Sequence, residues 1–274
     1  MSPDDSSRAP NAAQLNAPAY RPAALDMDFM LGDSTRGVRF LLEYAKAEEH
    51  LRRWGIRSTI VVFGSARIRS GPDGSDSHRP VPNGRRTRWY EEARRFGRIA
   101  SERGGALHNH DGIRDNVIAT GGGGGIMEAA NRGAREAGAP TIGFNITLPH
   151  EQEPNPYTTP DLTFRFHYFA MRKMHLAMRA NALVVFPGGF GTLDELFELL
   201  TLRQTGKMSD LPIVLFDRAY WTRIINFDAL VEEGMIAADD FKLFDFADDA
   251  EAAWETLVRR GLKAHTPPLD QPKK

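Results

Sequence analysis

Three glycine-rich segments, each directly after a short and largely apolar run, constrain the fold of this chain more than any other feature. The apolar runs cover residues 59–63, 116–119 and 183–186, and the glycines that follow them are Gly64 and those of segments 121–125 and 188–191. Strand and helix patterns alternate along the chain, which favours parallel strands joined by right-handed crossovers. Strands that are apolar throughout indicate a sheet covered on both faces. The sequence therefore predicts an α/β fold, a doubly wound parallel sheet with helices on both faces.

The spacing of apolar residues divides the chain into elements. We expect helices at residues 37–54, 88–103, 126–138, 168–180, 192–205, 219–233 and 249–261, and strands at 59–63, 116–119, 141–146, 162–166, 183–186 and 212–216. Residues 243–244 are expected to form a short strand or a turn. Residues 1–30 are rich in Pro, Ala, Ser and Asp without periodicity, which predicts a flexible N-terminal arm. Residues 31–264 are predicted to form a single domain, followed by a tail at residues 265–274.

Composition excludes several classes of protein. The 274 residues carry a formal net charge of −1, which argues against nucleic acid or an anionic membrane as a partner. The absence of cysteine excludes disulfides, thiolate metal sites and a cysteine nucleophile. No apolar run approaches the ~18 residues of a membrane span, and the polar N-terminus has no signal-peptide core. We expect a soluble cytoplasmic protein with no membrane association.

Residues 187–195 join the third apolar run to a helix and predict a phosphate site. The glycines in this stretch are Gly188, Gly189 and Gly191. Glycine lets the backbone approach a ligand closely, and the unpaired amides at a helix start bind anions. Thr192 could cap the helix and place its hydroxyl on the same phosphate. Asp194 and Glu195 add carboxylates where an ordinary phosphate loop would bring lysine.

A purely structural role is an alternative for the same residues. Thr192 and Glu195 form a T-x-x-E capping box, in which Glu195 would hydrogen bond back to the cap amide. A structural cap does not require three glycines at the carboxyl edge of a sheet, however. Arg172 and Lys173 could likewise be solvated helix charges, or they could face the same cleft and hold a phosphate or ribose oxygen.

Other nucleotide and metal motifs are absent or incomplete. The five-glycine run 121–125 does not fit the dinucleotide fingerprint, because Ile126 stands where the third glycine belongs and the next strand holds Asn145 instead of an acid. Five glycines suggest instead that this backbone also lines a cavity. No phosphate loop with a lysine and no nucleophile elbow is present. His108 and His110 lie in a polar loop without a third ligand at a recognisable spacing, so we expect no metal site.

Two motifs together resemble a known family. Met171-Arg172-Lys173, followed by the segment 187–195 (PGGFGTLDE), is similar to the pattern of the LONELY GUY family, the cytokinin riboside 5′-monophosphate phosphoribohydrolases, often labelled possible lysine decarboxylases. The resemblance runs from about residue 59 to residue 216. It implies a Rossmann-like fold, a homodimer or higher oligomer, and hydrolysis of the N-glycosidic bond of a nucleoside 5′-monophosphate, such as AMP or an N6-substituted AMP, to free base and ribose 5-phosphate.

The resemblance also assigns roles to residues. It places the catalytic arginine on Arg172 and the catalytic glutamate on Glu195. The substrate-binding residues it implies are Gly64, Ser65, Gly122, Gly123, Gly124, Lys173, Gly188, Gly189, Gly191, Thr192 and Asp194. The family commonly has two glutamates at the end of the motif, and Asp194 replaces the first of them here. No metal and no cofactor is implied, and no lysine is marked as an aldimine former, which disfavours decarboxylation.

Departures from the short plant-type members leave the substrate open. The N-terminal extension, the loop 66–87 and the insertion 104–114 are longer than in those members, as in long bacterial relatives. One alternative is a nucleosidase for ordinary purine or pyrimidine nucleotides, acting in salvage. Another is a nucleotide- or cofactor-binding carrier protein without turnover.

Overall fold

The computed structural model describes residues 10–68, 84–107, 112–147, 153–208 and 210–262. The parts of the predicted loops 66–87 and 104–114 that hold residues 69–83 and 108–111, and the predicted tail 265–274, lie outside the described residues. The chain divides into two compact units, Met1–Lys46 and Ala47–Lys274. Short helical segments make up the described part of the first unit. They are α1 (Ala12–Leu15), η2 (Pro18–Tyr20), η3 (Ala23–Leu25), α2 (Met27–Leu31), η4 (Asp33–Thr35) and the beginning of α3 (Arg36–Arg53).

A seven-stranded sheet forms the centre of the second unit. Its strands are β1 (Thr59–Phe63), β2 (Val117–Thr120), β3 (Ile142–Ile146), β4 (Thr163–Phe166), β5 (Ala180–Val185), β6 (Ile213–Phe216) and β7 (Asp245–Ala247). They lie in the order β4-β3-β2-β1-β5-β6-β7, and every pair is parallel. The predicted doubly wound α/β fold is confirmed.

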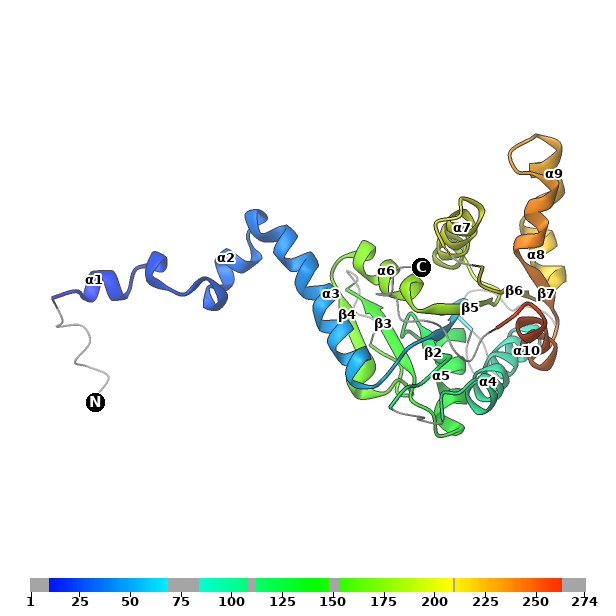
Figure 1. The fold of residues 1–274 in the computed structure, drawn as a ribbon, viewed down its shortest axis with the longest axis horizontal. Helices are drawn as coiled ribbons and strands as arrows, with labels where there is room; N and C mark the ends of the chain where they lie inside the picture. Colours follow the sequence, from blue (N-terminus) through cyan, green and yellow to red (C-terminus); the bar gives the residue numbers. More distant parts are fainter. Residues whose placement is uncertain (1–9, 69–83, 108–111, 148–152, 209, 263–274) are drawn as a thin grey trace, which may run out of the picture. The chain divides into compact units, whose positions relative to one another are not determined.

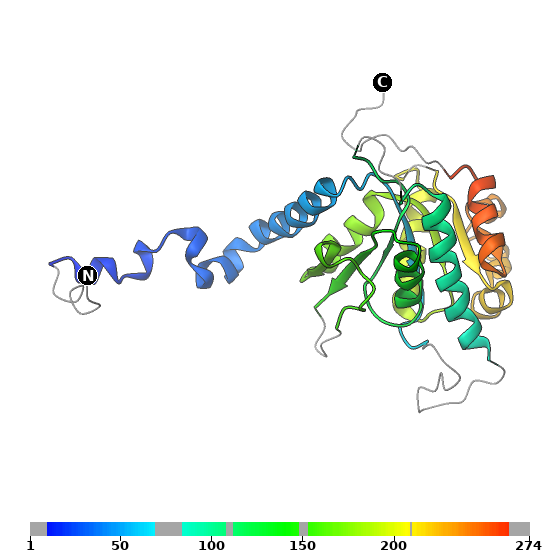
Figure 2. The same ribbon diagram turned by 90° about the horizontal axis from the view of Figure 1, so that it is seen from below.

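Helices cover both faces of the sheet (Figure 1). Side chains alternate along β1, so Val61 and Phe63 face one apolar core while Ile60 and Val62 face the other. The first core is closed by η5 (Pro160–Leu162), α6 (Phe169–Met178), α7 (Phe190–Gln204), α8 (Arg218–Ile224), α9 (Phe227–Glu232) and η6 (Ala238–Leu243). The second is closed by α4 (Arg85–Arg103), α5 (Ile126–Glu136) and α10 (Ala250–Arg259), the layer nearest the viewer in Figure 2.

Some predicted element boundaries are wrong for local reasons. The predicted helix 219–233 is two helices, because Ile225 is extended and the Asn226 side chain caps a new helix by accepting the amide of Ala229. The last strand is Asp245–Ala247, whose register with β6 pairs Asp245 with Val214. Residues 243–244, predicted as a short strand or a turn, precede it and are not part of it. Among the described residues, no helix combines the length and the apolar character that crossing a membrane requires.

The strand order reverses direction at β1, and this positions the site. From β1 the chain adds β2, β3 and β4 on one side, then returns to place β5, β6 and β7 on the other. Loops that leave β1 and β5 therefore diverge and open a crevice at the carboxyl ends of these strands, where ligands bind in such sheets. The segment after β1 begins with Gly64, and the segment after β5 begins with Phe186 and Pro187.

Candidate active site

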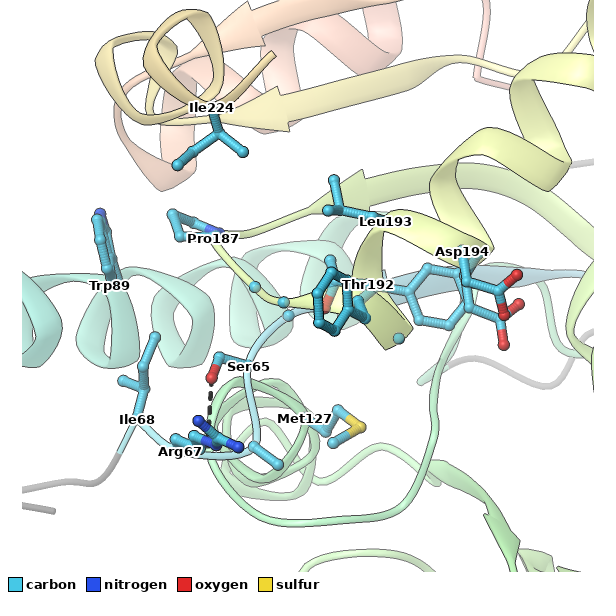
Figure 3. A pocket seen from close by; sticks show the side chains of 18 of the residues that line it. Ser65, Arg67, Ile68, Trp89, Met127, Pro187, Thr192, Leu193, Asp194 and Ile224 are labelled. Carbon is cyan, nitrogen blue, oxygen red and sulfur yellow. Dashed lines mark hydrogen bonds between the residues drawn. The ribbon is translucent and has the colours of Figure 1, made fainter. Parts of the chain in front are cut away.

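A cavity of about 840 Å³ lies at this crevice. Its walls come from the ends of β1 and β5, from the starts of α4, α5, α6 and α7, and from α8. Figure 3 shows Trp89, Ile68 and Ile224 around one side of the cavity, and Met127 and Asp194 toward the other. Predicted site residues in its lining are Gly64, Ser65, Arg172, Gly188, Gly189, Gly191, Thr192, Asp194 and Glu195.

The glycine turn, residues 187–191, runs along the cavity and begins α7. Gly189 is the N-cap and Phe190 the first helical residue. Within the described part of the chain, the amides of Gly189, Phe190 and Gly191 donate to no acceptor. A Cβ on Gly188 would lie 2.1 Å from the Thr192 hydroxyl oxygen, so only glycine fits there. The turn therefore presents unpaired donors at the positive end of a 15-residue helix.

The capping interpretations of Thr192 and Glu195 are wrong. The helix starts two residues earlier than predicted, so Thr192 is its third residue and its amide donates to the carbonyl of Gly189. No side chain of the described residues caps the helix. Glu195 lies one turn further on, with its carboxylate directed to Arg172 and not back to a cap amide. Thr192 still lines the cavity, so a hydroxyl remains available there.

Arg172, from α6, and Glu195, from α7, lie next to each other in the lining of the cavity. Arg172 Nη1 is 3.8 Å from Glu195 Oε1, longer than a hydrogen bond. The Nε of Arg172 donates to the carbonyl of Phe144 at 2.8 Å, which fixes the guanidinium. Gly121 makes room for it, since a Cβ there would lie 2.5 Å from Arg172 Nη2.

Burial disfavours the charged forms of both groups. Burial raises the pKa of Glu195 to about 7, and the nearby charge of Arg172 opposes this rise without cancelling it. Burial lowers the pKa of Arg172 from its ordinary value, with Glu195 and Asp194 acting in the opposite direction. A carboxyl with a pKa near neutrality, placed in a cleft, is suited to proton transfer.

Lys173 does not share this cavity. Its Nζ forms ion pairs with Asp194 at 2.8 Å and with Glu198 at 3.0 Å, and it lies outside the cavity lining. Asp194 is at the boundary, because it lines the cavity and also pairs with Lys173. Substrate binding by Lys173 stays a prediction, and its visible contacts join α6 to α7.

The five-glycine run lies behind the cavity wall. Gly122, Gly123 and Gly124 are outside the cavity lining. Asn155 Nδ2 donates to the carbonyls of Gly122 and Gly123, at 3.2 and 2.9 Å. Gly122 has φ +73°, and a Cβ on it would meet the side chain of Asn145 at 2.3 Å. Positive φ and close packing therefore account for Gly122, and the substrate contacts of Gly122, Gly123 and Gly124 stay a prediction.

Sequence reasoning missed several residues that line the cavity. They are Arg67, Ile68, Arg86, Trp89, Met127, Phe169, Tyr220 and Ile224. The sequence contained a signal for two of these residues. Arg67 lies two residues after Ser65 in the segment that follows β1, and Tyr220 lies three residues after Asp217, which directly follows β6. Trp89 and Arg86 enter from α4, whose distance from the other segments in sequence hides the contact.

The sequence of this chain is similar to those of known proteins. A family model described as "Possible lysine decarboxylase" matches residues 127–257. The "Probable cytokinin riboside 5′-monophosphate phosphoribohydrolase LOG4" of Oryza sativa subsp. japonica is 30% identical over 139 residues, 49% of this chain and 59% of that protein. The "Cytokinin riboside 5′-monophosphate phosphoribohydrolase LOG4" of Arabidopsis thaliana is 30% identical over 138 residues, 48% of this chain and 62% of that protein.

The chain is similar to the LONELY GUY family. Arg172, from the first part of the LONELY GUY pattern, and the whole segment 187–195, which is the second part, line the cavity. The match spans less than two thirds of the length of these two relatives. Among solved structures, the molybdenum cofactor binding protein from the phototrophic bacterium Rippkaea orientalis has a TM-score of 0.47 at 19% identity, over 74% of this chain and 96% of that chain.

Proposed function

We propose that this protein hydrolyses the N-glycosidic bond of a nucleoside 5′-monophosphate to the free base and ribose 5-phosphate. The observation that carries the proposal is Glu195, a buried carboxyl with a pKa of about 7, beside Arg172 and one turn from unpaired helix-start amides. The two relatives above are named as phosphoribohydrolases of such nucleotides, which supports the same reaction class.

The phosphate group fits the glycine turn. Unpaired amides at a helix start bind a phosphate oxygen, and Thr192 adds a hydroxyl at the same place. Among the described residues, the cavity lining holds three arginines, Arg67, Arg86 and Arg172, against the acids Asp194 and Glu195. One cation is therefore in excess even when both acids are ionised, which favours an anionic substrate.

Glu195 then acts on the sugar. Breaking the glycosidic bond develops positive charge at C1′, as in glycoside hydrolysis. A carboxylate close to the ribose stabilises this charge and orients or deprotonates the attacking water. The hydroxyl of that water ends on C1′, and in the net reaction its proton leaves with the base. Arg172 anchors the substrate and balances the carboxylate.

One experiment tests the reaction and the base together. Incubation with AMP, GMP, CMP, UMP and N6-isopentenyl-AMP, followed by chromatography of released bases, should show base release from at least one nucleotide. Release from AMP or the N6-substituted nucleotide identifies a cytokinin-type or adenine-specific enzyme, and release across the panel identifies a salvage nucleosidase. Binding of the nucleotides without base release would overturn the proposal in favour of a carrier.

A homodimer or larger assembly is part of the proposal. Near the cavity, α6 and α7 expose three phenylalanines, Phe169, Phe190 and Phe197, which are 53%, 93% and 39% exposed. Clustered exposed aromatic side chains are typical of protein–protein contacts. Light scattering should give a molar mass of at least twice the chain's 30.6 kDa, and a mass equal to one chain would contradict the assembly.

A further inference from the structure

Asp217, at the end of β6, is held in an unfavourable backbone conformation. It has φ +69°, the left-handed region that side-chain-bearing residues rarely adopt, and it is 5% exposed. Its carboxylate accepts hydrogen bonds from Arg85 Nη2 at 2.7 Å, from Trp89 Nε1 at 2.8 Å and from the amide of Tyr220 at 2.9 Å. Such strain persists only where surrounding contacts enforce it, and it often accompanies a functional constraint.

Two of the groups that Asp217 holds are walls of the cavity. Trp89 and Tyr220 both line it, and their rings pack edge to face at 5.6 Å. Asp217 also caps α8, the helix that carries Tyr220. The tyrosine ring is therefore fixed from its backbone end by the cap and from its side by Trp89.

The fixed ring ends on the glycine turn. The hydroxyl of Tyr220 donates to the carbonyl of Gly188 at 2.6 Å. In a planar trans peptide the carbonyl and the next amide point in opposite directions, so this bond directs the amide of Gly189 away from Tyr220. Glycines flank this peptide on both sides, so it has the least steric resistance to flipping. A flipped peptide would present a carbonyl oxygen, not a donor, to an anion.

We propose that Tyr220 is a positioning residue, fixed by Asp217 and Trp89, which holds the Gly188–Gly189 peptide in the orientation that binds a phosphate group. The inference rests on the proposed function, because it takes the glycine turn as the phosphate site. It adds residues outside the two motifs of the family pattern. The acid at the end of β6 and the aromatic side chains of α4 and α8 act on the ligand only through the turn.

The test compares Tyr220→Phe with the unchanged protein. Inorganic phosphate binding is measured by isothermal titration calorimetry, which requires no catalysis. Removing one hydroxyl donor should weaken phosphate binding by about 3- to 10-fold, the value of one hydrogen bond. Tyr90→Phe is the matched control. Tyr90 is 1% exposed, its hydroxyl bonds Glu128 at 2.9 Å, and it lies outside the cavity lining. Its phosphate affinity should equal that of the unchanged protein.

Kinetics separate positioning from a loss of folding. With the most active nucleotide, Tyr220→Phe should raise KM by about 3- to 10-fold and leave kcat within about twofold, whereas partial unfolding would lower kcat at constant KM. Equal phosphate affinity of the Tyr220→Phe and unchanged proteins would overturn the positioning role while leaving base release intact. Undetectable phosphate binding by the unchanged protein would overturn it as well. Absence of base release alone would contradict the proposed reaction, and the phosphate titration would still decide this inference.

Discussion

Two buried carboxyl groups in this protein each lie beside an arginine, yet their acidities shift in opposite directions. Glu195 is 3.8 Å from Arg172, and burial raises its pKa to about 7. Asp217 is 2.7 Å from Arg85. Burial, the largest single influence, would raise the pKa of Asp217, but hydrogen bonds from Arg85, Trp89 and the Tyr220 amide together lower it. A neighbouring cation is therefore not sufficient, and direct hydrogen bonds decide whether a buried acid stays ionised.

The comparison indicates a catalytic role for Glu195 and a structural role for Asp217. Asp217 has its donors in place and fixes the walls of the cavity. Among the described residues, no cation lies within hydrogen-bond distance of Glu195, since Arg172 is 3.8 Å away, and Glu195 lies in a cavity that a substrate can enter. We expect a substitution of Glu195 to lower turnover and a substitution of Asp217 to lower stability.

Glu195→Gln should have the largest effect. The amide keeps the size of the side chain but cannot accept a proton or stabilise positive charge at C1′, so kcat for base release should fall by about 100-fold or more. Circular dichroism and thermal unfolding should show a folded protein. Turnover close to that of the unchanged enzyme would remove Glu195 from catalysis and end the contrast with Asp217.

Arg172→Ala should lower turnover by about 100-fold as well, because it removes the cation that holds the substrate and balances Glu195. The protein should remain folded, since the side chain of Arg172 makes one hydrogen bond among the described residues, to the carbonyl of Phe144. Steady-state kinetics and the unfolding midpoint are the measurements. A folded variant with normal kcat and KM would show that the pairing of Arg172 with Glu195 is not needed for base release.

Asp217→Asn should act on stability. It removes the charge that pairs with Arg85 in a mostly buried setting. The unfolding free energy at pH 7 should therefore fall by about 2 kcal/mol. This loss is smaller than that for a fully buried ion pair, because Arg85 is partly exposed. An acid whose pKa is lowered on folding stabilises above its unfolded pKa and loses this contribution as pH falls. Urea titrations should therefore show the difference closing below about pH 4. A difference independent of pH would contradict the ion pair.

Glu195→Gln should show the opposite pH dependence of stability. The pKa of Glu195 is raised on folding from 4.5 to about 7, so the unfolded chain loses the proton first and the folded protein loses stability as pH rises through this window. Glutamine does not ionise. The variant should match the unchanged protein near pH 4 and exceed its unfolding free energy by about 3 kcal/mol at pH 8. Parallel stability curves would show that the pKa of Glu195 is not raised.

Lys173→Gln should have the smallest effect. Its ion pairs with Asp194 and Glu198 are partly exposed, so their loss should cost about 0.5 kcal/mol or less and change kcat/KM by less than about threefold. Kinetics at two salt concentrations would check this. A much larger rise in KM would place Lys173 on the substrate, as the family resemblance predicts.

Most of the fold could be predicted, because it depends on local pattern. The strands are short apolar runs, and Gly138 ends α5 with φ +84° close to where the sequence places the end. The pairing of Arg172 with Glu195 came only from the family resemblance, which supplied a three-dimensional relation that spacing does not contain.

What the sequence missed depends on contacts between distant segments. Trp89 and Asp217 lie 128 residues apart, and their hydrogen bond arises because α4 and the end of β6 meet at one edge of the sheet. The start of α7 was misplaced for a different reason. A T-x-x-E pattern suggests a cap at Thr192, but Gly189 already begins the helix, since glycine can adopt the cap conformation without a side-chain partner.

The central position of β1 has a consequence for synthesis. One of its two neighbours, β5, begins only at Ala180, so β1 keeps an open edge on that side while the first two thirds of the chain leave the ribosome. An open strand edge in the middle of a sheet invites pairing with other chains. The glycine turn, Glu195 and Tyr220 all follow that point. A product truncated before β5 would therefore be an aggregation-prone fragment and not a smaller enzyme.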